Sequence, residues 1–151
     1  TFGPGDVKAF TGRLILMAQR GQLLLSLPGI LNFVDVREVA VGHLAAGEKL
    51  SRGERVILGG HNLPVPEAIR LVNAVAGRRP PLLTLPRGLI ELVGRVLARL
   101  PVFALQDHMT TLHCWQPLST AKMEGILQVR PRPFAETVRD GLAWYREHGY
   151  L

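Results

Sequence analysis

The side chains with the chemistry of catalysis or ligand binding lie in two stretches of the chain, one near its start and one after its middle. They are, in chain order, Asp6, Arg13, Asn32, His43, His108, His113 and Cys114. A carboxylate or an imidazole can transfer a proton, and a guanidinium or an amide can hold a phosphate or a sugar hydroxyl. Imidazole and thiolate are zinc ligands, but the cluster of His108, His113 and Cys114 has no fourth ligand, so the sequence predicts no metal site.

The run from Asn32 to His43 forms the element that positions the first stretch. Asp35 is suited to be the N-cap of a helix, and Glu38, three residues later, completes the pattern of a capping box. Apolar or weakly polar side chains recur at helical spacing, at Val36, Val39, Ala40, His43 and Leu44. The helix is expected to end near residues 47–49. Because His43 lies on the apolar face, a hydrogen-bonded core histidine is favoured over a catalytic base.

A second extended segment follows this helix. Val56, Ile57 and Leu58 are apolar, two of them are β-branched, and Gly59 and Gly60 follow them directly. This pattern predicts a short buried strand that ends where two backbones approach closely.

The rest of the chain alternates between helical and extended patterns. Helices are expected over residues 10–21, 66–77, 89–100, 119–127 with Ser119 as N-cap, and 134–148, and a short strand over 82–85. The prolines at 131 and 133 predict an extended segment before the last helix. This alternation predicts an α/β fold whose strands join a mainly parallel sheet.

Composition limits the class of protein. With 151 residues, 47% of them hydrophobic, the chain is expected to form one domain. Its single cysteine excludes an intrachain disulfide and favours a reducing, cytoplasmic location. Prolines and arginines interrupt the apolar stretch 85–105, which predicts an amphipathic helix instead of a membrane span. The net charge of +6 attracts anions, but the arginines are scattered, so nucleic-acid binding is the least favoured function.

Four segments together carry a resemblance to a known family. They are Thr-Phe-Gly-Pro-Gly-Asp at 1–6, Thr-Gly-Arg-Leu-Ile-Leu at 11–16, the run 32–43 with Glu-Arg-Val-Ile-Leu-Gly-Gly at 54–60, and Pro-Arg-Pro-Phe at 131–134 leading to 144–151. They resemble the C-terminal half of the extended short-chain dehydrogenases/reductases, the NAD(P)-dependent epimerase/dehydratase family. Within it they look closest to hopanoid-associated sugar epimerases and dihydroflavonol-4-reductase-like proteins. Two departures are Glu38, where the family usually has Asp, and the absence of a glycine helix stop in 127–131.

The resemblance implies a fold and a set of site residues. The fold would be the C-terminal part of an NAD(P)-binding Rossmann-type fold with a small, mostly helical substrate lobe. It would be a single partial domain over 1–151, with Rossmann-side elements in 1–60 and the substrate lobe in 61–151. The family's cofactor would pass Thr1, Phe2 and Gly3, and its substrate would pass Asp6, Arg13 and Asn32. Each has a structural alternative: a glycine-dependent loop for 1–6, backbone pairing for Asn32, and a solvated surface for Arg13 and for Arg37, a further candidate phosphate contact.

The motifs that the family uses for chemistry are absent from this chain. No glycines have the spacing of a dinucleotide-binding turn, and neither Tyr145 nor Tyr150 has a lysine four residues later. The expected function is therefore the substrate-binding portion of an NAD(P)-dependent nucleotide-sugar epimerase/dehydratase or reductase, inactive by itself and without tight binding of NAD or NADP. Its partners would be a small sugar-like substrate and either the missing N-terminal half or a second copy. The alternative is a non-catalytic binding or assembly module of the same fold.

Overall fold

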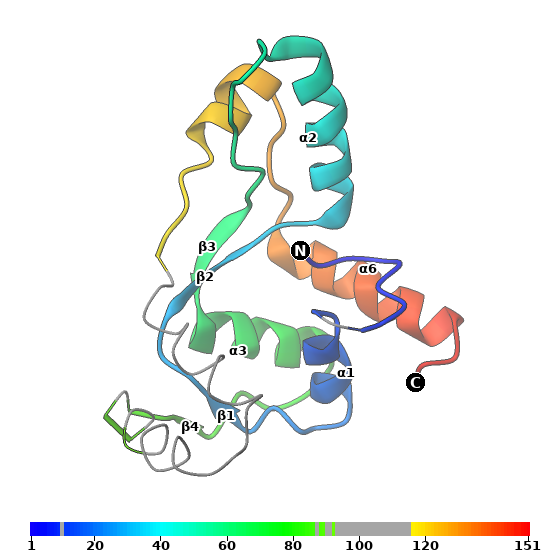
Figure 1. Ribbon diagram of the computed structural model, residues 1–151. Helices are drawn as coiled ribbons and strands as arrows, with labels where there is room; N and C mark the ends of the chain where they lie inside the picture. The colour runs from blue at the N-terminus through cyan, green and yellow to red at the C-terminus, as the bar shows by residue number, and fades with distance from the viewer. Residues whose placement is uncertain (10, 87, 90–91, 93–115) are drawn as a thin grey trace, which may run out of the picture.

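The computed structural model describes residues 1–9, 11–86, 88–89, 92 and 116–151 (Figure 1). The expected helix 89–100 and the cluster of His108, His113 and Cys114 lie mostly or wholly outside the described residues. In chain order the elements are α1 (Arg13–Gln19), β1 (Leu25–Ser26), β2 (Ile30–Phe33), α2 (Val36–Lys49), β3 (His61–Pro64), α3 (Val65–Val75), β4 (Leu83–Thr84), the π-helix η2 (Met123–Leu127) and α6 (Phe134–Glu147). Mixed helices and strands confirm the predicted α/β class.

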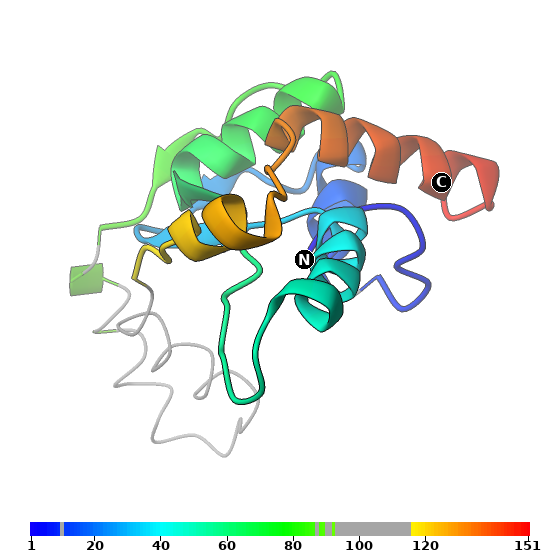
Figure 2. The same cartoon turned by 90° about the horizontal axis from the view of Figure 1, so that it is seen from above.

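Two groups of buried side chains hold these elements together. The larger one joins α1, α3 and α6 to β2, and its centre contains the fully buried Ile15, Val138 and Tyr145. The smaller one surrounds Met123, Leu127 and Val129 of the η2 region and rests on α2. Figure 2 shows α3 and α6 side by side, and Figure 1 shows α2 and η2 together at the end of the β2–β3 ribbon that is farther from α3. The predicted buried face of α6 is confirmed at Phe134, Val138, Leu142 and Tyr145.

The described strands form two pairs. β1 pairs with β4 in parallel, whereas β2 pairs with β3 in antiparallel register, with Asn32 opposite Asn62. A further parallel bridge joins Phe2 to Asp35. The expectation of a mainly parallel sheet therefore holds for β1–β4 and not for β2–β3.

The strand predicted at 56–58 is wrong in this structure, because residues 54–60 are assigned to no strand and β3 begins only at His61. The predicted close approach of backbones at the glycines is confirmed. A Cβ atom on Gly60 would lie 1.9 Å from the carbonyl oxygen of Phe33. The apolar pattern of 56–58 is real, but a strand also needs a neighbouring strand, and the described residues place none beside it.

The N-cap of α2 is confirmed, whereas its predicted buried face is wrong. Asp35 accepts a hydrogen bond from the backbone N–H of Arg37 at 2.8 Å, and the helix ends at Lys49 as expected. The residues buried along α2 are Glu38 and Gly42, while Leu44 is 72% exposed. His43 is exposed and bonds the carbonyl of Val39 instead of lying in a core. Leu58 packs directly over Gly42, and this long-range contact selects the face.

The segment without a glycine helix stop has an unusual backbone. Gln128 itself takes the left-handed conformation after η2, with φ 59° and ψ 29°, which glycine adopts at less cost. Ser119 does not cap η2, since the hydroxyl that bonds near its start is that of Thr120, which donates to Glu124. Residues 128–133 then run without regular structure to α6, as the prolines predict.

Among the described residues, no helix combines the length and the apolar character that crossing a bilayer requires.

Candidate functional site

The opening residues of the chain lie against the start of α2. Phe2 donates its N–H to Val34 and accepts from the N–H of Val36, both at 2.8 Å. Its ring packs in an aromatic cluster with Phe33 and Phe134, at centroid distances of 5.5 and 5.3 Å. Because both its backbone groups and its ring are engaged, Phe2 retains only van der Waals contact as a means of touching a cofactor.

Thr1 and Gly3, unlike Phe2, do not pack a side chain into the aromatic cluster. The side chain of Thr1 is exposed, and its carbonyl accepts a hydrogen bond from Thr11. Gly3 has φ 137°, and a Cβ atom there would lie 2.8 Å from Cγ1 of Val36. This position therefore needs glycine so that the loop can pass close to α2. The cofactor contact of both residues stays a prediction.

Asp6 closes the loop onto α1. One carboxylate oxygen accepts from the N–H of Gly12, the N-cap of that helix, at 2.8 Å, and from the Thr11 hydroxyl at 3.4 Å. The Tyr145 hydroxyl donates to the Asp6 carbonyl at 3.1 Å. Burial, with Asp6 and Tyr150 nearby, raises the pKa of Tyr145 to about 12, so this phenol stays a neutral donor. The observed role of Asp6 is to hold the loop.

Arg13 and Asn32 have opposite environments. Arg13 is exposed at the first position of α1, and its guanidinium has no hydrogen-bond partner in the part of the chain that the structure describes. The Asn32 amide, in contrast, donates to the Gly60 carbonyl at 3.0 Å and accepts from the Gly60 N–H at 2.7 Å. It also donates to Asn62 at 2.9 Å. Asn32 therefore has the structural role that was its alternative, whereas the Arg13 guanidinium has no partner among the described residues.

An ionic cluster with two buried carboxylates, Asp35 and Glu38, joins the start of α2 to α6 and to the segment before it. The Asp35 side chain is fully buried and accepts two hydrogen bonds from the Arg37 side chain, at 2.9 and 2.7 Å. Arg37 also bonds Asp140 at 2.7 Å. Arg132 donates its backbone N–H and its Nε to Glu38 at 2.7 and 2.8 Å. The capping-box role predicted for Glu38 is therefore wrong, since its carboxylate binds Arg132, and Arg37 is paired instead of free for a phosphate.

The electrostatics of this cluster hold Asp35 ionised. Burial by itself raises the pKa of the Asp35 carboxyl, but hydrogen bonds from Arg37 and from the Thr137 hydroxyl lower it more, to about 2. The same contact with Asp35 is the main reason that the pKa of Arg37 is raised. At neutral pH the cluster is a set of paired charges that fixes the geometry beside the opening loop.

Sequence reasoning missed Arg132, Thr137 and Asp140 as partners of this cluster. Arg132 lies 94 residues after Glu38, and Asp140 lies 103 residues after Arg37. No local spacing rule connects residues so far apart. The only signal was the extended segment with prolines at 131 and 133, which holds the backbone of Arg132 outside a helix.

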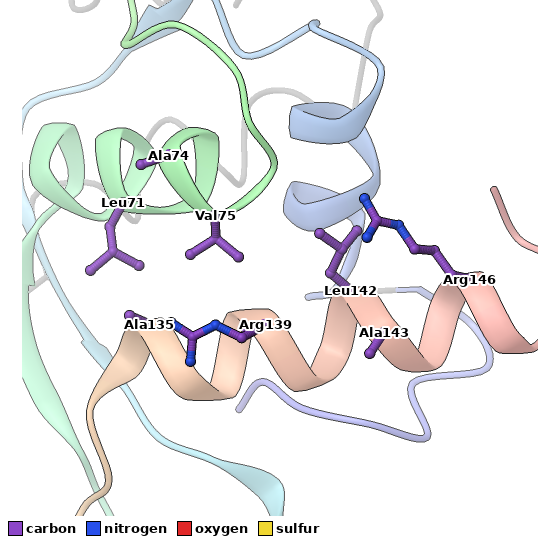
Figure 3. Close-up of a pocket in the computed structure, with 8 residues that line it drawn as sticks. All are labelled: Leu71, Ala74, Val75, Ala135, Arg139, Leu142, Ala143 and Arg146. Atoms are coloured by element: carbon purple, nitrogen blue, oxygen red, sulfur yellow. The ribbon is translucent and has the colours of Figure 1, made fainter.

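A hollow of about 530 Å³ lies between α3 and α6, away from these residues (Figure 3). It is lined by Leu71, Ala74, Val75, Ala135, Arg139, Leu142, Ala143 and Arg146. Six of these are apolar, and the two arginines come from α6. None of the six residues expected to touch cofactor or substrate lines this hollow, so it is not the predicted site. Within the described residues, no group of three His, Cys, Asp or Glu side chains is placed to hold a metal ion.

Known proteins are similar to this chain over nearly its whole length. It is 30% identical, over 162 residues, to a putative dihydroflavonol 4-reductase of Synechocystis sp., a match that covers 99% of this chain and 47% of that protein. The solved structure of a nucleoside-diphosphate-sugar epimerase from Pseudomonas aeruginosa matches with a TM-score of 0.82 and 26% identity, over 99% of this chain and 46% of the other. No family model matches the chain.

A more distant structure shows the same fold. It is UDP-glucuronic acid 4-epimerase from Bacillus cereus in complex with NAD, with a TM-score of 0.63 and 15% identity over 97% of this chain and 42% of that one. The chain thus spans about half the length of the relatives that it matches.

Proposed function

We propose that this chain, which is homologous to the C-terminal half of the NAD(P)-dependent epimerase/dehydratase proteins, is the substrate-side portion of such an enzyme. The observation that carries the proposal is that 99% of the chain matches only 46–48% of its relatives, with a TM-score of 0.82 for one of them. The substrate is a nucleotide-linked sugar or a related small molecule. The chemistry is epimerisation, dehydration or reduction, and it needs a dinucleotide site that this sequence lacks.

In this proposal the residues divide into a scaffold and a contact surface. Asp6, Asn32 and the cluster around Asp35 hold the loop, the ribbon and α2 in place through their hydrogen bonds. Arg13 is the candidate for contact with a phosphate, because its exposed guanidinium has no partner among the described residues. Thr1 and Gly3 border the cofactor that the other half would hold. The protein acts in the cytoplasm.

The first prediction concerns the cofactor. Calorimetric titration of the purified chain with NAD⁺ and with NADP⁺ is expected to give no binding at micromolar concentrations, because no glycine-rich turn at a helix N-terminus is available for the pyrophosphate. Micromolar binding of either dinucleotide would contradict the proposal that the other half of the enzyme holds the cofactor.

The second prediction concerns the substrate. UDP-glucose, a nucleotide sugar used as a probe, is expected to bind the chain weakly, and Arg13→Ala should weaken that binding about fivefold through the loss of an exposed charge pair. Ligand-observed NMR measures the change. Arg20→Ala, an exposed arginine at the other end of α1, is the matched control and should leave binding unchanged. Equal effects of the two substitutions would show that general positive charge, and not Arg13, attracts the probe.

A further inference from the structure

The hollow between α3 and α6 is long and mostly apolar. Six of its eight lining residues are apolar, and three of these are alanines, whose side chains are too short to fill the space between the helices. Leu71 and Val75 of α3 point from their helix toward α6 (Figure 3). Along α6 the lining runs from Ala135 to Arg146, which at the rise of an α-helix is about 16 Å. The hollow is therefore long enough for about three turns of another helix.

The two polar residues of the hollow are arginines with donors to spare. Arg139 is exposed and makes no hydrogen bond or ion pair with any residue that the structure describes. Arg146 donates to the side chain of Gln19 at 3.4 Å, a long bond that engages one of its terminal nitrogens. None of the described residues that line the hollow carries a carboxylate. The hollow is therefore positively charged, and a complementary partner supplies negative charge.

The acidic residues of α6 lie on another side of that helix. Asp140 pairs with Arg37 at 2.7 Å, and neither Glu136 nor Glu147 lines the hollow, although both are exposed. Basic and acidic side chains are thus segregated around α6, and the basic stripe borders the apolar lining. An exposed apolar surface with a polar rim is typical of a protein–protein contact site.

The spacing of the two arginines distinguishes between kinds of partner. Arg139 and Arg146 are seven residues apart, so their backbones are about 10 Å apart along α6. In Figure 3, Arg139 extends along α6 toward Ala135, whereas Arg146 extends toward α1, where it bonds Gln19. One small carboxylate or phosphate can therefore pair with either guanidinium but cannot bridge the two. Two carboxylates that are two turns apart on a helix match both.

We propose that the hollow between α3 and α6 is a docking site for an acidic amphipathic helix of a partner protein. Apolar side chains of that helix, three or four residues apart, fill the space above the alanines, as in other helix-in-groove complexes. Two of its carboxylates, seven residues apart, pair with Arg139 and Arg146. This interaction surface goes beyond the proposed function and does not depend on it, because none of the residues expected to touch cofactor or substrate lines the hollow.

The test uses the whole chain and a synthetic helix as the probe. The probe is a peptide of about 16 residues with leucine at every third or fourth position and two glutamates, seven residues apart, beside the leucines. Fluorescence anisotropy of the labelled peptide is expected to give a dissociation constant below about 100 μM. The same peptide with glutamine in place of both glutamates should bind about tenfold more weakly, because two ion pairs are lost. Equal affinities of the two peptides would overturn the proposal.

Substitution of the arginines completes the comparison from the side of the protein. The double variant Arg139→Gln with Arg146→Gln should bind the glutamate peptide about tenfold more weakly and the glutamine peptide as the parent does. Arg70→Gln is the matched control, since Arg70 is an exposed arginine of α3 that does not line the hollow. All three side chains are exposed, so the variants should keep the melting temperature of the parent. If Arg70→Gln weakens binding as much as the double variant, general positive charge attracts the peptide and the proposal fails.

Two further measurements locate the probe and exclude a different kind of partner. Ala74→Phe fills the hollow from an exposed position and should weaken binding of both peptides at least tenfold, and unchanged binding would place the probe elsewhere and overturn the proposal. Vesicles of phosphatidylglycerol test for a membrane contact. If the chain sediments with these vesicles through Arg139 and Arg146 but does not bind the glutamate peptide, the hollow faces a lipid surface and the proposed helix is wrong.

Discussion

Gly60→Ala is expected to lower the free energy of unfolding by about 3 kcal/mol or more, because the added methyl group would overpack against backbone atoms. The added Cβ would lie 1.9 Å from the Phe33 oxygen, 2.8 Å from its carbonyl carbon and 2.9 Å from Cα of Val34. All three are backbone atoms, so no side-chain rotation relieves the clash. The chain must instead separate Gly60 from β2 and break the two hydrogen bonds to Asn32.

Gly47→Ala is the matched control for that substitution. Gly47 lies inside α2, and a Cβ atom there meets nothing within 4 Å. Because alanine favours a helix by up to about 1 kcal/mol over glycine, this variant should be slightly more stable than the parent. Urea unfolding followed by circular dichroism measures both. If Gly60→Ala unfolds at the same urea concentration as the parent, the close contact between Gly60 and Phe33 does not exist in solution.

Loss of Asp35 should have the second-largest effect. At neutral pH, Asp35→Ala is expected to lower the free energy of unfolding by about 3 kcal/mol, because the helix loses its cap and two arginines lose a fully buried partner. Asp140→Ala is the matched control, since it removes a carboxylate from the same Arg37 at a site that is 41% exposed. That substitution should cost less than about 1 kcal/mol.

The same carboxyl makes stability depend on pH at the acid end. The pKa of Asp35 is about 2 in the folded chain against a usual value of 3.8, so the unfolded chain binds the proton more readily. Lowering the pH from about 5 to about 2 therefore favours unfolding, and the part due to Asp35 is about 2 kcal/mol. The stabilisation is fully present above pH 5. Asp35→Asn should be less stable at neutral pH and should lose this part of the acid dependence. Parallel curves for the two proteins between pH 5 and pH 2 would contradict the assignment.

The structure changes the meaning of several residues that the sequence singles out. Arg37 and Asn32 have the chemistry to bind a phosphate or a sugar, yet both are engaged within the protein, with Asp35 and Gly60 respectively. Arg13 keeps a free guanidinium among the described residues. Of the three expected substrate contacts it is the one whose side chain has no structural role, which makes it the sharpest target for mutation.

The sequence by itself determined the features that depend on a few neighbouring residues. These are the Asp35 cap, the end of α2, the helices α3 and α6 with the buried stripe of α6, and the close backbone approach at Gly60. It also determined the relationship to the epimerase/dehydratase proteins, because the order of motifs along the chain needs no coordinates.

Only the tertiary structure decided which partner each of these elements would have. The predicted face of α2 is open because Leu58 packs on the opposite side at Gly42, and Glu38 binds Arg132 instead of closing its own helix start. The strand predicted at 56–58 has the right side chains and no neighbour among the described residues. Local patterns fix backbone preference and periodicity, whereas burial and pairing depend on contacts between residues that are 16 to 103 positions apart in the sequence. That physical difference separates what could be predicted here from what could not.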